Sequence, residues 1–405
     1  MKAYPLSFNN SENAFAYKTD KELKDAAFLF STMSHPLLVK LGSKITPFIV
    51  RSGLPLKALI KKTLFNQFVG GETLAETARV VDKLEKFEVN VILDYGVEGK
   101  EGEESFERSC DEFIRVIDYA SGQPNIPFIS IKITGFARFA LLEKLDAAAS
   151  GKSGYLGHVH TEVLSEEERE EWDRVVLRME KIVEAAAAGS VGALVDAEET
   201  WIQDPVDALT MQMMEKFNRQ RVVVYNTIQL YRSDRLDFLH KSLDAAKKNT
   251  FVLGAKLVRG AYMEKERKRA GQMNYPSPIQ PNKEATDRDY NEALNSCLQN
   301  INDVSTIVAT HNEHSNLLAT QLMDTLGIDR HHRHVHFSQL YGMSDQITFN
   351  LAKAGYSVSK YLPFGPVGDV IPYLMRRAQE NTAVAGQTGR ELVLIKKEIN
   401  RRKKK

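Results

Sequence analysis

The chain has 405 residues, of which 43% are apolar and 26% are charged, and its formal net charge is +1. This composition is ordinary for a globular protein with a large core, and it excludes a strongly basic surface that would attract nucleic acid. The only two cysteines, Cys110 and Cys297, are too far apart in sequence to indicate a disulfide framework or a metal cluster, which favours a reducing compartment. No apolar run could cross a bilayer, and the N-terminal residues lack the apolar stretch of a secretory signal, so a cytoplasmic location is expected.

The N-terminal part of the chain is expected to be a helical arm over residues 1–85. Its clearest helix covers 73–87, where Thr73 and Glu76 have the spacing of a capping box ahead of apolar residues at helical intervals. The sequence pattern changes after this arm, at about residue 86.

Residues 86–390 alternate between short β-branched runs and amphipathic helices. Such alternation predicts a parallel sheet covered by helices, and eight runs favour closure into an α/β barrel of the (βα)8 TIM type. No G-x-G-x-x-G turn follows the first run, which argues against a classical dinucleotide fold. The expected strands cover residues 89–95, 128–134, 192–198, 222–229, 254–260, 305–311, 335–340 and 356–362.

The C-terminal segment 391–405 is expected to be a basic tail. Its last ten residues, KKEINRRKKK, include seven basic ones. We interpret this run as a solvated, frayed end. The alternative is weak attraction to an anionic membrane surface.

In a (βα)8 barrel, functional residues gather at the C-terminal ends of the strands. Here ionisable or amide side chains occur at nearly every expected strand end, which a purely structural barrel does not need. They are Asp94, Tyr95, Lys132, Asp196, Glu198, Glu199, Gln229, Lys256, Arg259, Thr310, His311, Gln339, Lys360 and Tyr361.

Two lysines and an aspartate stand out among these residues. Lys132 lies in an apolar run, where an outward orientation would bury an ammonium group without an evident partner, so we favour an inward, functional orientation. Lys256 presents the same ambiguity. Asp196 can neutralise a substrate ammonium group, or it can simply cap the loop that follows its strand.

The segment 361–381 carries the strongest local signal. Asp369 is expected to cap a helix on which Arg376 and Arg377 share one face with Tyr373 and Glu380. Two adjacent guanidinium groups form a natural clamp for a carboxylate, and Glu380 is placed to orient one of them. The alternative is a surface helix with ordinary ion pairs, but the position after the last strand favours the clamp.

Two further patterns carry weaker signals. After Arg259, Gly260 permits close approach of a ligand to the backbone, and the flat ring of Tyr262 can pack against a ligand. Four histidines lie at the start of the seventh strand, but that end of a barrel serves stability and no carboxylates converge there, so we predict no metal site. They are His331, His332, His334 and His336.

Five segments together resemble the proline dehydrogenases. They are KLVRGAYMEKER, LVDAEET, VVVYNTIQLY, ATHNEHS and YLPFGPVGDVIPYLMRRAQEN, and the resemblance spans about residues 65–385. Many bacterial members have Arg in place of Lys256 and Lys in place of Arg259, so KLVRGAY is similar to the mitochondrial-type branch, and we expect a bacterial member of that branch.

The resemblance implies a distorted (βα)8 barrel that binds FAD and proline at its C-terminal face. It implies that Asp196 and Lys256 act in catalysis or tune the flavin, that Lys132, Arg376 and Arg377 hold the proline carboxylate, and that Glu98 pairs with Arg376 to gate the site. The implied ring contacts are Tyr262, Leu340, Tyr361 and Tyr373, and the implied flavin contacts are Ala197, Gln229, Arg259, Gly260, Ala261, Thr310 and His311.

The implied reaction is oxidation of L-proline to 1-pyrroline-5-carboxylate by hydride transfer to flavin N5. A membrane quinone would accept the electrons, with peripheral contact at the inner face of the membrane, and a pyrroline-carboxylate dehydrogenase is a further expected partner. Tyr361 favours proline over hydroxyproline because its phenol would crowd a ring hydroxyl. Hydroxyproline dehydrogenase is the close alternative, and a Schiff-base aldolase that uses Lys132 or Lys256 as nucleophile is the distant one.

Overall fold

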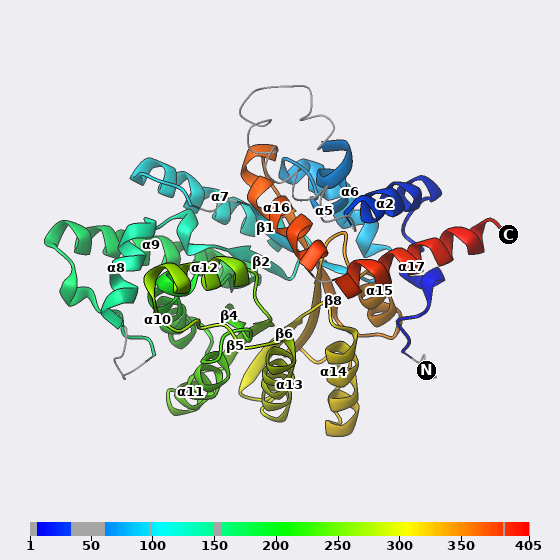
Figure 1. Ribbon diagram of the computed structural model, residues 1–405. Coiled ribbons are helices and arrows are strands. Elements are labelled where there is room, and N and C mark those ends of the chain that lie inside the picture. Colours follow the sequence, from blue (N-terminus) through cyan, green and yellow to red (C-terminus); the bar gives the residue numbers. More distant parts are fainter. Residues whose placement is uncertain (1–5, 34–60, 97–98, 150–155, 384, 405) are drawn as a thin grey trace. The chain divides into compact units, whose positions relative to one another are not determined.

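The computed structural model describes residues 6–33, 61–96, 99–149, 156–383 and 385–404. Its eight strands form a closed barrel in the order β1 to β8 (Figure 1), which confirms the predicted fold class. The strands are β1 (Asn90–Tyr95), β2 (Phe128–Ile131), β3 (Gly192–Val195), β4 (Val224–Gln229), β5 (Leu253–Val258), β6 (Val304–Ala309), β7 (Val335–Leu340) and β8 (Val358–Phe364).

Strands β2 and β3 end earlier than the sequence predicted. Lys132 already precedes the 3-10 turn η2 (Ile133–Gly135). The two strands pair in parallel up to Ile131 opposite Val195, and the Asp196 N–H then donates to the Ile131 carbonyl at 2.9 Å. Lys132 and Asp196 therefore follow neighbouring strands at the same level.

One compact unit covers Val97–His336. Its longest helix begins with a capping box formed by Ser165 and Glu168 and ends before a left-handed Ser190. The helices are α7 (Glu103–Ser121), α8 (Phe139–Ala149), η3 (Thr161–Val163), α9 (Glu166–Gly189), α10 (Thr200–Phe217), α11 (Arg235–Lys248), α12 (Met263–Met273), α13 (Lys283–Gln299) and α14 (Glu313–Leu326).

The other compact unit combines Met1–Gly96 with Phe337–Lys405. Thr73 caps its predicted helix by accepting from the Glu76 N–H at 3.3 Å. An apolar cluster that includes Phe30, Phe68 and Leu394 forms its core. The helices are α1 (Ser11–Ala14), α2 (Asp20–Met33), η1 (Lys61–Phe65), α5 (Asn66–Phe68), α6 (Leu74–Glu85), α15 (Asp345–Lys353), α16 (Val367–Ala383) and α17 (Ala385–Arg402).

The start of α16 differs from the prediction. The helix begins at Val367, so Asp369 lies in its first turn and is not its N-cap residue. The Asp369 N–H donates to the Pro366 carbonyl at 2.9 Å, which already closes a turn before the expected cap. A carboxylate in the first turn still complements the helix dipole.

The C-terminal segment also differs from the prediction. Most of it belongs to the packed helix α17, which is drawn red in Figure 1, and not to a frayed tail. Leu394 and Ile395 are buried, and Glu398 accepts hydrogen bonds from Arg401 and Arg402 at 2.8–2.9 Å. Apolar anchors and this ion-pair group hold the segment, although its composition alone indicates solvation.

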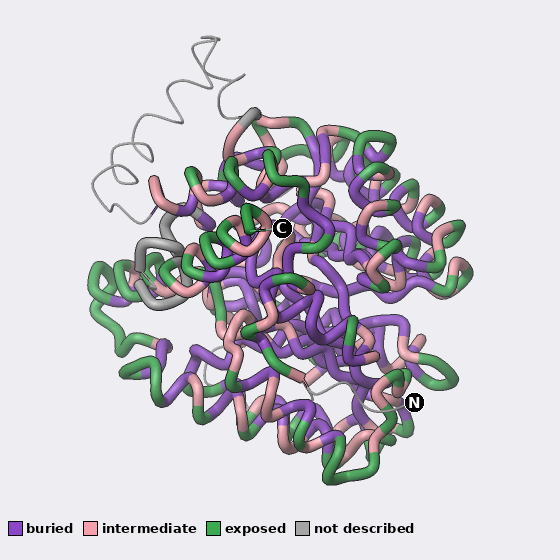
Figure 2. Tube along the Cα trace, turned by 90° about the vertical axis from the view of Figure 1, so that its right-hand side faces the viewer, coloured by how far each residue is buried: buried purple, intermediate pink, exposed green. Residues whose placement is uncertain are grey.

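Burial follows the turns of the helices. Figure 2 shows buried and exposed residues alternating along them, as expected for amphipathic helices. Cys110 and Cys297 are both buried, and burial raises their thiol pKa values to about 11 and about 12. Among the described residues, no helix has both the length and the apolar composition that a membrane-spanning segment requires.

Candidate active site

The register of β4 and β5 directs Lys256 into the barrel. Asn226 donates to Asp207 of α10 at 2.9 Å, so the Asn226 side chain points to the helix layer. Asn226 is opposite Ala255, and the next pair along is Thr227 with Lys256. Because successive side chains alternate between the two faces of a sheet, Thr227 and Lys256 face the interior.

Asp196 joins the two predicted lysines. The Lys132 Nζ atom lies 3.3 Å from Asp196 Oδ2, and Lys256 donates to Asp196 Oδ1. Both lysines are buried, with 7% and 4% of their surface exposed. Two ammonium groups and one carboxylate form a group of net charge +1, which suits an anionic ligand. The structure thus brings Lys132, Asp196 and Lys256 together.

Polar side chains extend this group toward the end of β4. Thr134 donates to the buried Glu198 carboxylate at 2.7 Å, and the Gln229 side-chain nitrogen donates to the Glu198 carbonyl at 3.1 Å. The Gln229 Oε1 atom is buried and has no hydrogen-bond partner among the described residues. A buried acceptor in this state is costly unless a ligand satisfies it.

Arg259 lies at the end of β5 within a polar group that spans β5, α13, β6 and α14. Its guanidinium donates to Asp287 at 2.7 Å, to Thr310 at 2.6 Å and to Ser315 at 3.0 Å. It also lies 4.3 Å from the centre of the Tyr290 ring. Burial favours the neutral acid, but hydrogen bonds from Lys283 and Arg259 outweigh it and keep the pKa of Asp287 below its ordinary value. Sequence reasoning missed Asp287, which lies in α13 outside every motif, and it assigned no role to Ser315 although this residue ends the segment ATHNEHS.

The turn after Arg259 needs its glycine for packing. Gly260 has φ +133°, and a Cβ atom there would lie 2.4 Å from the Tyr231 ring. Ala261 is exposed, and Tyr262 is half-buried just before α12. Gly260 therefore allows the Tyr231 ring to approach the backbone, while Tyr262 remains accessible. The two remaining predicted flavin contacts in this unit, Ala197 and His311, are half-buried and follow β3 and β6.

In the other unit, α16 carries the predicted arginine pair. Arg377 is buried, and its guanidinium lies 5.1 Å from the centre of the Tyr373 ring. Arg376 is half-buried on the same helix. The Glu380 side chain and the whole of Glu98 lie outside the described residues.

Tyr361 and Lys360 point to opposite faces of β8. The Lys360 Nζ atom lies 2.9 Å from Asp345 of α15 and donates to the Leu340 carbonyl at 3.4 Å, so this lysine faces the helix layer. Tyr361 must then face the barrel interior. Its carbonyl accepts from the Tyr341 N–H at 2.8 Å, which ties β8 to the chain just after Leu340.

Asp345 is the centre of a buried charged group that the sequence did not reveal. Tyr17 donates to it at 2.7 Å, and the Lys18 ammonium lies 3.8 Å away. Burial favours the neutral acid, but Lys360 and Lys18 outweigh it and hold the pKa of Asp345 below its ordinary value. Burial and the Asp345 carboxylate raise the pKa of Glu391 to about 8. Tyr17 and Lys18 are more than 300 positions from Asp345, and Lys360 and Glu391 lie on other elements than Asp345, so no local pattern could join them.

The histidines at the start of β7 have structural contacts. The His334 Nδ1 atom lies 2.7 Å from the Ile301 carbonyl. The His336 ring packs edge-on against Phe128 at 5.0 Å, and burial lowers the pKa of His336 to about 3. Both rings are therefore part of the packing at this end of the barrel.

The sequence model of the family described as proline dehydrogenase matches residues 77–390 of the chain, which is more than half of its length. The chain belongs to the proline dehydrogenase family. Membership in this family displaces the aldolase alternative. It also agrees with the motifs that carried the resemblance, four of which lie at the strand ends described above.

The proteins that resemble this chain differ in how much of their own length the chain covers. Mitochondrial proline dehydrogenase 1 of Dictyostelium discoideum is 34% identical over 379 residues, which cover 86% of this chain and 66% of that protein. Hydroxyproline dehydrogenase of Xenopus laevis is 35% identical over an alignment of 422 positions, which covers 98% of this chain and 90% of that protein. The solved structure of proline utilization A (PutA) from Bdellovibrio bacteriovorus has a TM-score of 0.70 at 19% identity and covers 92% of this chain and 38% of that chain, a likeness of fold. The chain thus spans just under two thirds of the Dictyostelium protein.

Proposed function

We propose that this proline dehydrogenase family member oxidises L-proline to 1-pyrroline-5-carboxylate with FAD as its cofactor. The observation that carries the proposal is the buried Lys132–Asp196–Lys256 group at the ends of the barrel strands. A cationic, partly neutralised group in the interior of a barrel suits a small zwitterion and an electron-accepting ring.

The residues at the ends of β4 to β6 fit a flavin nucleotide. The buried Gln229 Oε1 atom lacks a partner among the described residues, and an isoalloxazine ring carries an N–H group that can donate to it. Arg259 and Thr310, joined at 2.6 Å, lie close to the start of α14, where a helix favours phosphate oxygens. We assign Ala197, Gly260, Ala261 and His311 to the same cofactor site.

We assign the substrate carboxylate to three cations, Lys132, Arg376 and Arg377. Arginine binds a carboxylate through two parallel N–H groups in one plane. A small ligand that is held at several points stays in the orientation that the reaction requires. We further propose that Tyr262, Leu340, Tyr361 and Tyr373 enclose the pyrrolidine ring and exclude water. Glu98 and Glu380 are proposed to pair with the arginines.

In this scheme Asp196 and Lys256 are the catalytic pair. When bound, FAD supplies the acceptor for the hydride that leaves the carbon beside the proline nitrogen. Asp196 holds the Lys132 and Lys256 ammonium groups at fixed positions, so that positive charge is already in place before electrons arrive. Such preorganised charge is the usual way in which a protein stabilises a developing anion.

We propose a membrane quinone as the final electron acceptor and a pyrroline-carboxylate dehydrogenase as the consumer of the product. Lys396, Lys403 and Lys404 on or after α17 are exposed and could attract an anionic inner membrane surface. The other basic residues of this segment contribute less, because Arg401 and Arg402 already pair with Glu398.

The visible spectrum of the purified full chain tests the proposal. We expect flavin absorbance that bleaches when L-proline is added without oxygen, while D-proline leaves it unchanged. A protein that takes up no flavin, or a flavin that stays oxidised with L-proline, would contradict the function.

Hydroxyproline is the second candidate substrate, since the Xenopus relative that covers 98% of this chain is a hydroxyproline dehydrogenase. We expect kcat/KM to favour L-proline over trans-4-hydroxy-L-proline because the Tyr361 phenol occupies the space of a ring hydroxyl. Tyr361→Ser should lower the ratio of kcat/KM for L-proline to kcat/KM for trans-4-hydroxy-L-proline. A wild-type preference for hydroxyproline would reverse the assignment.

A further inference from the structure

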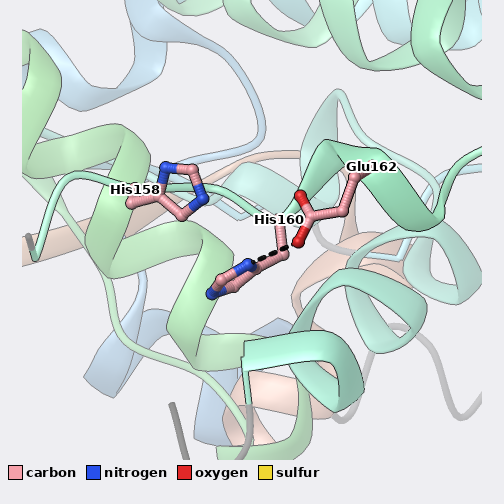
Figure 3. Close-up of side chains that lie close together, drawn as sticks. All are labelled: His158, His160 and Glu162. Carbon is pink, nitrogen blue, oxygen red and sulfur yellow. Dashed lines mark hydrogen bonds and ion pairs between the residues drawn. The ribbon is translucent and has the colours of Figure 1, made fainter. Parts of the chain in front are cut away.

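A second group of polar side chains lies in the connection between α8 and α9. His158, His160 and Glu162 each offer one donor atom, and these three atoms all lie within 4.8 Å of one another. Figure 3 shows the Glu162 carboxylate beside the His160 ring, with His158 nearby on the same segment. No part of the proposed oxidation uses these residues.

The local backbone explains why the three side chains converge. His158 and His160 are two residues apart in a non-helical segment, a spacing that places side chains on one side. The turn η3 then starts at Thr161 and brings Glu162 back, with its Oε1 atom 2.9 Å from His160 Nδ1. The His158 and His160 ring centres are 4.6 Å apart.

Neighbouring helices hold this segment on both sides. The Gly157 carbonyl accepts from Gln212 of α10 at 2.6 Å, and the Thr161 carbonyl accepts from Arg169 of α9 at 3.3 Å. The Leu164 N–H closes η3 on Thr161 at 3.1 Å. The backbone that carries the three donors is therefore anchored, while the His158 and Glu162 side chains are exposed.

The other histidine cluster lacks this arrangement. His334 contacts the Ile301 carbonyl and His336 is buried against Phe128. Within the described ranges, only the 158–162 group brings three histidine, cysteine or carboxylate donors together. The sequence pattern drew attention to the histidines at 331–336, where no metal site was predicted, and it gave no sign of the turn that brings Glu162 back toward His160.

We propose that His158, His160 and Glu162 bind a divalent transition metal ion of the zinc class. Imidazole nitrogen and carboxylate oxygen are zinc ligands, and three protein ligands with a water complete a tetrahedral site. Ligands about 2.1 Å from one zinc ion are roughly 3.4 Å apart, so small side-chain rotations from the observed separations suffice. The ion would link the two ends of the pentapeptide and stiffen the α8–α9 connection.

Zn²⁺ titration of the full chain by calorimetry, after chelator treatment, tests this proposal. We expect one saturable site that is lost in His158→Gln and in His160→Gln. Glu162→Gln should also lose most of this binding, because it replaces the one anionic ligand of the proposed site by a neutral amide.

His332→Gln is the matched control, because its ring lies 5.5 Å from that of His334 and no carboxylate among the described residues completes a group of three donors there. It should bind Zn²⁺ like the wild-type chain. Absence of saturable binding, or equal binding by the His158→Gln/His160→Gln double variant, would overturn the proposal. Bleaching by L-proline should be the same with and without Zn²⁺, so the metal site and the oxidation are tested separately.

Discussion

Asp196 determines where two buried ammonium groups lie. Lys132 follows β2 and Lys256 lies on β5, and both reach the same carboxylate from different strands. Neither lysine could keep its position by local backbone geometry alone, since each has a long flexible side chain. The carboxylate is therefore the residue on which the proposed charge arrangement depends.

Asp196→Asn should impair both folding and catalysis. Removing the charge of one partner in a buried ion pair costs about 3–5 kcal/mol, and here two ammonium groups lose their counter-charge. We expect a lower free energy of unfolding in urea and a large fall in kcat with L-proline. Asp244→Asn, at an exposed position of α11, is the control and should change neither. A variant with wild-type kcat would remove Asp196 from the catalytic pair.

Lys132 and Lys360 show what the sequence could and could not predict at this scale. Both interrupt apolar strands, and the sequence gives no reason to treat them differently. Lys132 contacts Asp196 and faces inward, as expected for a lysine without an outward partner. Lys360 faces outward instead, because α15 supplies Asp345 as its partner, and Asp345 in turn accepts from Tyr17. Contacts between separate elements cannot be read from a local pattern.

At the scale of elements, the strands were predictable and some helix ends were not. Eight β-branched runs located all eight strands because parallel strands covered on both faces are buried throughout and read as short apolar runs. The ends of β2 and β3 were misplaced, since turn η2 and the early end of β3 depend on tertiary hydrogen bonds. Helix α17 was missed because its basic composition concealed buried Leu394 and Ile395.

Helix α16 presents two arginines that should contribute separately to substrate binding. A charge-assisted hydrogen bond contributes about 1.5–3 kcal/mol, which corresponds to roughly 10–100-fold in affinity. We expect Arg376→Met and Arg377→Met each to raise the KM for L-proline by this factor, with flavin content unchanged. Steady-state kinetics with Arg333→Met, an exposed position, provide the comparison. Unaltered KM values in both α16 variants would contradict the clamp.

At the scale of the whole molecule, the buried group around Asp345 should make stability depend on pH. Glu391 faces Asp345, Lys360, Lys18 and the Ser344 N–H, and its pKa in the folded state is raised to about 8. The folded chain therefore holds a proton that the unfolded chain has released above about pH 4.5. Stability from this group is complete below that pH and is lost as pH rises toward 8.

Glu391→Gln should remove this dependence, because the amide cannot ionise. We expect the wild-type free energy of unfolding to fall between pH 5 and 8 by up to ~1.4 kcal/mol per pH unit, and the variant to show a flatter profile. Urea unfolding at several pH values measures both. Glu284→Gln, an exposed position in α13, is the control, and parallel profiles for wild type and Glu391→Gln would refute the assignment.

The opposite orientations of Lys360 and Tyr361 have a practical consequence for altering substrate preference. These two adjacent residues have different roles. Lys360 anchors β8 to the helix layer, and Tyr361 lines the proposed pocket for the substrate ring. A mutant library aimed at bulkier cyclic amines should therefore randomise position 361 while preserving the Lys360–Asp345 contact. Libraries that vary both codons together would lose many members to misfolding before any gain in selectivity could be detected.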